Sequence, residues 1–359
     1  MTSTADKPSG TLEPVEHAGR SALVPRAAAT DGARRYLLAA RADSTRAAYA
    51  SDWVHFIDWC GNQPDAPLPH LPAAPETVAF YLAEHAGTLK VATLIRRCSA
   101  ISAVHQAAGH PSPTISPLVR TTLAGIRRVH GVHQQAKDPL LAHQLRRLLD
   151  ALPQEPAKAL IAARDRALLV LGFYGALRRS ELVGLETGDV EVNEQGLVAT
   201  LRRSKTDQDA AGRRIAMLHT GSADSCPAEV YLAWLAALDA ALAKEQLPLE
   251  GDRQQVEEHG RLASPVFRPV NRHGSPAPAR LTDKAVARVV QRTALRAGLG
   301  DLDLAGHSLR AGFATTTAAA GKSERSIMKQ TGHKSLPMVR RYIREGSLFR
   351  DNATDGIVL

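Results

Sequence analysis

Four polar residues near the end of the chain combine nucleophilic and cationic chemistry. The stretch HSLRAGFATTTAAAGKSERSIMKQTGHKSLPMVRRY, residues 307–342, contains His307, Arg310, His333 and Tyr342. A phenol has a pKa of about 10 and attacks poorly near neutral pH, so it needs cationic charge and a base nearby. A tyrosine that only packs in a core needs neither. This stretch therefore raises the hypothesis of a tyrosine nucleophile for a negatively charged substrate.

Each member of this set also has an ordinary structural interpretation. The tyrosine could be a core residue on one helical stripe with Met338 and either Leu336 or Val339. His307 could cap the helix that follows the preceding glycine, and His333 could lie in a turn. From this stretch by itself, both interpretations stay open.

Two earlier segments add further candidates. GALRRSELVGL, residues 175–185, places Arg178 and Glu181 three apart, which on a helix could be no more than an ordinary ion pair. SKTDQDAAGRR places Lys205 at the tip between two expected strands, where a lysine is often simply solvated. The order along the chain is arginine, lysine on a hairpin, His-x-x-Arg, histidine and tyrosine.

This ordered set resembles the tyrosine recombinase (phage integrase) family over roughly residues 140–350. GALRRSEL resembles the first arginine box, SKTDQ the hairpin lysine, HSLRAGFAT the His-x-x-Arg box, GHKS the second histidine box, and MVRRYIRE the nucleophile box. The long HSLRAGFATTTAAAG run and the YIRE ending are most similar to the Cre-like branch. Any one box is a weak signal, whereas five boxes in the right order are a strong one.

Phosphodiester chemistry assigns a role to each residue. Arg178 and Arg310 can clamp the charge that develops on the nonbridging phosphate oxygens, because a guanidinium forks onto such oxygens. His307 is the candidate to assist Tyr342, and Lys205 can protonate the departing alkoxide.

The remaining site residues complete this scheme. His333 can donate to the remaining phosphate oxygen, and Glu181 orients the cationic groups. No Asp/Glu cluster of metal type is evident, so we expect neither a metal nor a cofactor. The three cysteines Cys60, Cys98 and Cys226 are isolated, without metal-ligand spacing. Their sparse, odd count suits a reducing cytosol and predicts a cytoplasmic protein.

The charge balance agrees with a polyanionic partner. The chain has 359 residues and a formal net charge of +9. Nine Lys or Arg against Glu324 and Glu345 give +7 over residues 305–350, so most of the net charge lies beside the tyrosine. A solvated basic helix face is the alternative explanation. No apolar run approaches the roughly 20 residues of a membrane span, so we expect no membrane association.

The elements that must position these residues form a mainly α-helical fold with a small antiparallel β-sheet. Apolar periodicity predicts four helices, at 44–60, 75–87, 90–109 and 116–131. Further helices are expected at 142–152, 158–177, 227–244 and 281–298, and strands at 189–192, 197–204 and 213–218. Four arginines fall off the apolar stripes of the first helices and could face DNA phosphates: Arg96, Arg97, Arg127 and Arg128.

The length allows two domains. The expected segments are a disordered arm at 1–33, a helical core-binding (SAM-like) DNA-binding domain at 34–130, a linker at 131–139, a catalytic domain at 140–346 and a tail at 347–359. Residues 40–130 match the family only in length and helical pattern. The resemblance implies a C-shaped clamp, with one domain on each side of a duplex.

The resemblance also implies a reaction. Tyr342 would attack a scissile DNA phosphate, form a 3′-phosphotyrosyl link and free a 5′-hydroxyl, which permits strand exchange through a Holliday junction without ATP. The implied partner is double-stranded DNA with paired inverted half-sites. The implied assembly is a homotetramer on DNA and a monomer or weak oligomer when free, and the apolar tail could dock on a neighbouring protomer.

Three rival functions stay open at this point. A type IB topoisomerase-like enzyme carries a similar constellation but relaxes DNA as a monomer, and telomere resolvases form hairpins and are usually longer. A non-catalytic DNA-binding protein would explain the charge and the helices, but not why every catalytic position is filled. Assembly of four protomers on two DNA sites distinguishes a recombinase from a topoisomerase.

Overall fold

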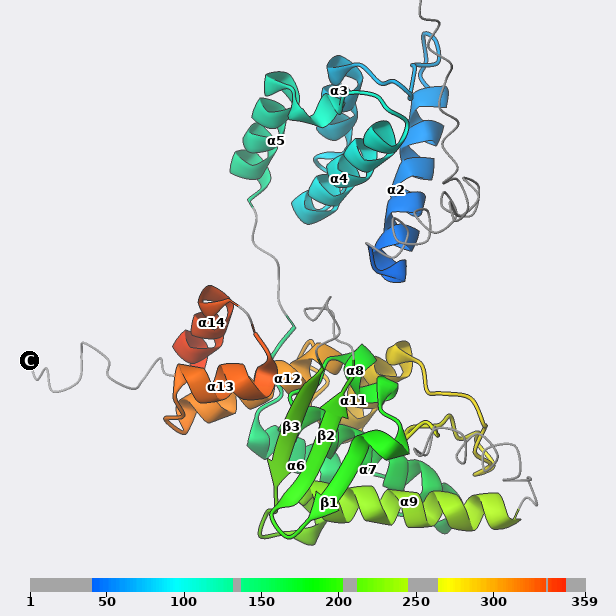
Figure 1. Cartoon of the computed structure of the whole chain (residues 1–359), viewed down its shortest axis with the longest axis vertical. Coiled ribbons are helices and arrows are strands. Elements are labelled where there is room, and N and C mark those ends of the chain that lie inside the picture. The colour runs from blue at the N-terminus through cyan, green and yellow to red at the C-terminus, as the bar shows by residue number, and fades with distance from the viewer. Residues whose placement is uncertain (1–40, 132–136, 203–211, 245–263, 334, 347–359) are drawn as a thin grey trace, which may run out of the picture. The chain divides into compact units, whose positions relative to one another are not determined.

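The protein is described by a computed structural model that divides into two compact units, Met1–Gln134 and Gln135–Leu359 (Figure 1). The structure describes residues 41–131, 137–202, 212–244, 264–333 and 335–346. The expected N-terminal arm, the hairpin tip and the C-terminal tail lie outside these residues. Among the described helices, none combines the length and hydropathy that a membrane span requires.

Over residues 41–131, the first unit is a bundle of four helices. They are α2 (Asp43–Gly61), α3 (Pro75–His85), α4 (Val91–Ala107) and α5 (Pro117–His130), with a short 3-10 turn, η1 (Pro113–Ile115), before α5. Phe56, Tyr81, Leu82 and Leu94 are fully buried at its centre. The four helices predicted from apolar periodicity are confirmed, each to within about two residues at its ends.

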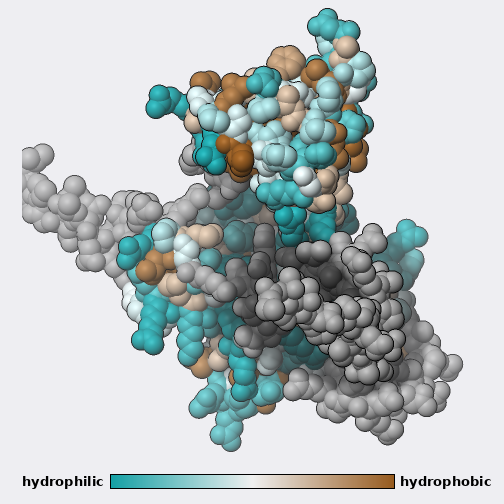
Figure 2. Space-filling view, turned by 45° about the horizontal axis from the view of Figure 1, so that its top comes forward, coloured by the Kyte–Doolittle hydropathy of each residue, from teal (hydrophilic) through white to brown (hydrophobic). Residues whose placement is uncertain are grey.

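The surface of the first unit carries scattered hydrophobic side chains. Figure 2 shows them as small brown patches among polar residues on the visible face. The exposed large ones among the described residues of this unit are Val54, Leu71, Phe80, Ile115, Leu118 and Val129. Isolated apolar side chains are normal on a protein surface and indicate no partner.

In its described residues, the second unit is mainly helical, with one three-stranded sheet. Its α-helices are α6 (Ala142–Asp150), α7 (Ala159–Tyr174), α8 (Arg179–Gly184), α9 (Pro227–Lys244), α11 (Asp283–Arg296), α12 (Gly306–Ala319), α13 (Glu324–Thr331) and α14 (Leu336–Gly346). Its 3-10 turns are η2 (Pro156–Lys158), η3 (Thr187–Asp189) and η4 (Ala223–Ser225).

The sheet is antiparallel throughout, in the order β1 (Val190–Asn193), β2 (Gly196–Leu201) and β3 (Arg213–Leu218). Ala199 of β2 pairs with Val190 on one side and Ile215 on the other. One face of β3 is buried and the other is exposed, as expected for a sheet that packs on one side only. The predicted small antiparallel sheet is confirmed.

Helix α7 lies at the centre of the second unit. Its residues Leu168, Leu169, Val170 and Leu171 are all fully buried. Four consecutive buried residues point to all sides of a helix, so this part of α7 must be covered on every side, and α7 packs against α9 and α12 among others. Because α7 ends just before Arg178 and packs against α12, this core fixes the two segments that carry the predicted arginines.

The chain enters the second unit by packing its backbone directly on α12. The N–H of Leu140 donates to the carbonyl oxygen of Ser308 over 2.9 Å. One turn later, a Cβ added to Gly312 would lie only 1.7 Å from the Leu140 carbonyl oxygen. Only glycine therefore permits this approach of two backbones.

We expect Gly312→Ala to destabilise the second unit, because the Leu140 backbone must move away from α12 and its bond to Ser308 is then lost. Gly184→Ala is the matched control, since nothing lies within 4 Å of the Cβ that it would add. Thermal unfolding of both variants measures the difference. If the Gly312→Ala protein had the same melting temperature as the wild-type protein, the close approach of the Leu140 backbone to α12 would be contradicted.

Candidate active site

Four helices of the second unit carry the described members of the predicted catalytic set. Arg178 immediately precedes α8, His307 and Arg310 lie near the start of α12, His333 follows α13, and Tyr342 lies on α14. The helices α12, α13 and α14 pack against one another (Figure 1). Lys205, the remaining member, lies outside the described residues.

The tyrosine hydroxyl meets a histidine from another helix. Nε2 of His307 lies 3.1 Å from the Tyr342 hydroxyl oxygen. The rings of His333 and Tyr342 lie 5.8 Å apart between centroids. The fold thus brings His307, His333 and Tyr342 together, although they are spread over three helical segments.

The ring of Tyr342 also has a structural role. It packs against a small buried cluster that includes Ala314, Ile327 and Val339. The core interpretation is therefore correct for the ring, while the hydroxyl reaches His307. Of the residues expected to share its stripe, Val339 is fully buried, whereas Leu336 and Met338 are exposed.

Glu181 holds Arg178 by two hydrogen bonds. The backbone N–H of Arg178 donates to one carboxylate oxygen over 2.9 Å, and its Nη1 donates to the other over 2.5 Å. The Glu181 side chain is almost completely buried. Arg178 lies just before α8, so this carboxylate serves the start of the helix and the guanidinium at once. The pair is thus more than a surface ion pair.

Arg310 is the most deeply buried of the cations at this site. The residue is 1% exposed, and its Nη1 donates to the carbonyl oxygen of Ala176 over 2.7 Å. Ala176 has φ of 47°, a left-handed conformation that costs a non-glycine residue roughly 1–2 kcal/mol. The buried Nη2 of Arg310 has no hydrogen-bond partner among the described residues. This donor is available to an anionic ligand.

Arg213 is a site residue that the sequence analysis missed. Its Nη1 donates to the Gln330 carbonyl at the end of α13 over 2.9 Å, and its Nη2 lies 4.0 Å from Glu181. Gly332, with φ of 65°, ends α13 against this guanidinium, and an added Cβ would lie 2.4 Å from Nη1. Arg213 therefore joins the first residue of β3 to the segment that presents His333.

A signal for Arg213 was present in the sequence. Side chains alternate between the two faces of a strand, and Ile215 and Met217 of β3 are buried. Arg213 lies two residues before Ile215 and therefore shares the buried face. Its neighbour Arg214 points to the other face and pairs with Glu191 over 3.0 Å.

The buried positive charge lowers the pKa of its neighbours. Burial and then the charge of Arg178 lower the pKa of Arg310 to about 10. Burial lowers the pKa of His307, and the charges of Arg310 and Arg178 lower it further. His307 is therefore neutral at pH 7 and can accept the Tyr342 proton.

His333 has the same environment and a defined tautomer. Burial and then the Arg310 charge lower its pKa to about 4. Its Nδ1 lies 2.8 Å from the Thr331 hydroxyl oxygen, and that hydroxyl gives its single hydrogen to the Ile327 carbonyl. Nδ1 of neutral His333 therefore carries the proton, and Nε2 carries the lone pair. The predicted donation from His333 to a phosphate oxygen would have to come from Nε2, and it requires uptake of a proton.

The four arginines predicted to face DNA lie in different surroundings. Arg97 falls off the apolar stripe but is buried, and it donates to the Tyr81 hydroxyl over 2.7 Å, so it does not face solvent as a DNA contact would require. Arg97 and Arg96 both form ion pairs with the buried carboxylate of Asp52. Arg96 also forms two hydrogen bonds to Asp52, and its side chain is half exposed. Arg127 and Arg128 are exposed, and their contact with DNA stays a prediction.

Comparison with protein families and known proteins agrees with this geometry. The model of the phage integrase family matches residues 139–347. An integrase/recombinase xerD homolog from Selenomonas ruminantium is 38% identical over 324 residues, which cover 89% of this chain and 87% of that protein. The tyrosine recombinase XerC of Myxococcus xanthus is 30% identical over 200 residues, about half of each chain (53%).

Solved structures show the same fold. A XerH site-specific recombinase bound to its difH substrate aligns with a TM-score of 0.57 at 19% identity, over 84% of this chain and 76% of that chain. A lambda integrase dimer bound to a core site aligns with a TM-score of 0.52 at 19% identity, over 92% and 99%. The narrower resemblance to the Cre-like branch stays a prediction.

The family model covers more than half of the chain, and the Selenomonas relative aligns over most of both proteins. The chain therefore belongs to the phage integrase family of tyrosine recombinases.

Proposed function

We propose that this protein is a site-specific DNA recombinase that breaks and rejoins DNA through Tyr342. The observation that carries the proposal is the 3.1 Å contact between Nε2 of His307 and the Tyr342 hydroxyl. Beside it, buried Arg310 keeps a donor without a hydrogen-bond partner among the described residues. A poised phenol next to buried guanidinium groups suits attack on a phosphodiester.

In the proposed cleavage step, each proton transfer and each bond change involves a named residue. His307 accepts the proton of the Tyr342 hydroxyl, and the phenolate oxygen bonds to the scissile phosphorus. Arg178 and Arg310 stabilise the charge on the nonbridging oxygens. The bond from phosphorus to the 5′ oxygen breaks, and Lys205 gives that oxygen a proton. The products are a 3′-phosphotyrosyl link and a free 5′-hydroxyl.

The phosphotyrosyl link keeps the bond energy of the broken strand. A 5′-hydroxyl from a partner duplex can therefore attack it in the reverse of cleavage, which requires no ATP. Because Arg178 and Arg310 supply the positive charge, the chemistry needs no metal. Neither property is required by family membership alone, and both belong to the proposal.

The assembly follows from the number of nucleophiles. Exchange of both strands between two duplexes needs four nucleophiles, and one chain supplies only Tyr342. We therefore propose a tetramer on two sites, each with paired inverted half-sites, with a Holliday junction as intermediate and a free protein that is monomeric or weakly associated. Clamping of the duplex by both units, docking of residues 347–359 on a neighbour and a cytoplasmic location are parts of the same proposal.

Two other functions fit parts of the site. A type IB topoisomerase-like enzyme would use the same tyrosine chemistry but would not hold two DNA sites in a tetramer. A protein that only binds DNA has no need of a tyrosine hydroxyl placed at a neutral histidine. Light scattering on the complex with two DNA sites distinguishes a recombinase tetramer from a topoisomerase-like monomer. Formation of a covalent protein–DNA adduct distinguishes the recombinase from a protein that only binds DNA.

Tyr342→Phe should abolish cleavage and leave DNA affinity nearly unchanged, because only the attacking oxygen is removed. Sequencing the DNA retained on this variant first identifies the target site. Protein–DNA adducts that survive denaturant are then measured on a nicked duplex of that site. Tyr174→Phe, on α7, is the matched control and should still form the adduct. An adduct formed by the Tyr342→Phe protein would rule out the assigned nucleophile.

Lys205→Ala should slow cleavage of an ordinary phosphodiester because the leaving alkoxide then lacks its proton donor. A substrate with sulfur in place of the scissile 5′ bridging oxygen should recover much of the rate, since a thiolate leaves without a proton. Lys322→Ala is the control and should cleave both substrates at the wild-type rate. An equal defect of the Lys205 variant on both substrates would show that another group donates the proton.

A bound phosphate should raise the pKa of His333. In the free protein this pKa is lowered to about 4, so the folded state resists protonation and loses stability as the pH falls from about 6.5 towards 4. An anion beside the imidazole favours its charged form. NMR titration of Tyr342→Phe protein, free and on its DNA site, measures the change, and His333→Gln identifies the signal. An unchanged pKa on DNA would contradict donation from His333 to the phosphate.

A further inference from the structure

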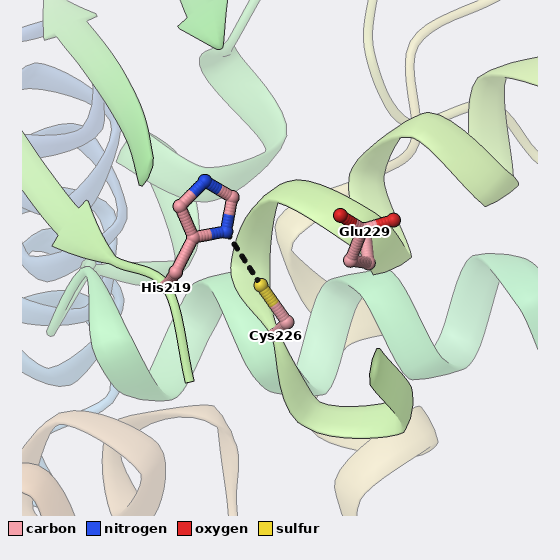
Figure 3. A group of neighbouring side chains, drawn as sticks. All are labelled: His219, Cys226 and Glu229. Atoms are coloured by element: carbon pink, nitrogen blue, oxygen red, sulfur yellow. Dashed lines mark hydrogen bonds between the residues drawn. The ribbon is translucent and has the colours of Figure 1, made fainter. Parts of the chain in front are cut away.

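A second cluster of reactive side chains lies where β3 leads into α9. His219 follows β3, Cys226 immediately precedes α9, and Glu229 lies in the first turn of α9 (Figure 3). Nδ1 of His219 lies 3.2 Å from Sγ of Cys226, and the three potential ligand atoms all lie within 4.8 Å of one another. The sequence analysis treated Cys226 as isolated, and the fold gives it two partners.

The histidine of this cluster is held in one tautomer. Its Nε2 lies 3.2 Å from the backbone carbonyl oxygen of Asn193, at the end of β1. A carbonyl can only accept, so Nε2 carries the proton and Nδ1 presents its lone pair towards the Cys226 sulfur. Metal-bound histidines commonly have this arrangement, in which the second ring nitrogen donates to a carbonyl that fixes the ring.

The cysteine of this cluster is placed to bind as a thiolate. It precedes the 18-residue helix α9, whose N-terminus favours negative charge. In contrast, burial raises the pKa of Cys60 and of Cys98 to about 11, and neither belongs to a cluster of ligands among the described residues.

We propose that Nδ1 of His219, Sγ of Cys226 and the Glu229 carboxylate bind a divalent cation of the zinc class, such as Zn²⁺ or Co²⁺. Nitrogen, sulfur and carboxylate ligands suit Zn²⁺, whereas Mg²⁺ and Ca²⁺ prefer oxygen alone. Tetrahedral bonds of about 2.0–2.3 Å place two ligand atoms about 3.5 Å apart, close to the observed 3.2 Å.

Solvent can supply the cation and the remaining ligand. His219 and Glu229 are exposed, while Cys226 is buried behind them. On binding, the cation forms a bond to the Cys226 sulfur, and the thiol proton leaves to solvent. No residue assigned to the cleavage of DNA takes part.

The bound cation would cross-link two elements. It would join the segment after β3 to the N-terminus of α9, with the end of β1 held through Asn193. The other end of β3 begins at Arg213, which contacts the end of α13. The ion is therefore structural, and its removal should lower the melting temperature without preventing formation of the phosphotyrosyl adduct.

The test uses the full chain without a histidine tag, stripped with chelator, and needs no DNA. We expect one equivalent of Zn²⁺ to bind in calorimetry, and Co²⁺ to give a near-ultraviolet thiolate charge-transfer band. His219→Gln and Cys226→Ser should weaken binding by more than the roughly 10–100-fold that loss of an outer-shell partner costs. Glu229→Gln should weaken it at least about tenfold, and Cys226→Ser should also remove the thiolate band.

Cys98→Ser is the matched control, because this cysteine lies in the other unit, and it should keep both the affinity and the band. Circular dichroism checks that each variant is folded. His219 and Glu229 are exposed, so their variants decide the outcome even if Cys226→Ser fails to fold. Absence of stoichiometric Zn²⁺ and Co²⁺ binding in the wild-type protein would overturn the proposal, as would unchanged affinity in both exposed variants.

Discussion

Two guanidinium groups approach one buried carboxylate at the candidate active site, and a third is buried close to them, so the positive charge there is not balanced. Glu181 bonds Arg178 and lies 4.0 Å from Arg213, whereas Arg310 is 1% exposed and donates to a backbone carbonyl. Burying charge without a counter-charge is costly, and the lowered pKa of Arg310, about 10, reflects that cost. A phosphodiester supplies negative charge, so this arrangement favours phosphate binding. The same field keeps His307 neutral, which a proton acceptor requires.

Like charges repel, so the surrounding backbone must hold them in place. The left-handed conformation of Ala176 turns its carbonyl onto Arg310, a strained conformation of the kind that collects at functional sites. Gly332 lets Arg213 reach the end of α13, and Gly312 lets the incoming chain lie on α12. The two glycines are required because a Cβ at either position would occupy the space that a backbone or a guanidinium fills.

The sequence predicts the elements of this fold better than it predicts the contacts among them. Apolar periodicity was sufficient to predict the four helices of the first unit and the sheet, because burial of one face sets the spacing of apolar residues in both kinds of element. It was insufficient for Arg97, because an arginine beside an apolar stripe can be buried when the Tyr81 hydroxyl accepts from its Nη1 and the Asp52 carboxylate lies 3.7 Å from its Nε. Strand alternation could have identified Arg213. The positive φ of Ala176 could not be predicted, because alanine disfavours it and only the tertiary structure imposes it.

The proposed nucleophile and the proposed phosphate-binding groups rest on different cores. Leu177 and Leu182, beside Arg178, and Leu309, beside Arg310, belong to the large cluster of the second unit. Tyr342 instead packs on a small separate cluster of Ala314, Ala318, Ile327 and Val339. An element with few buried apolar partners opens at a lower free energy than one in the main core. In the proposed mechanism, the position of the tyrosine can therefore change at a lower free energy cost than the positions of the arginines, which would make phosphate binding and attack separable steps.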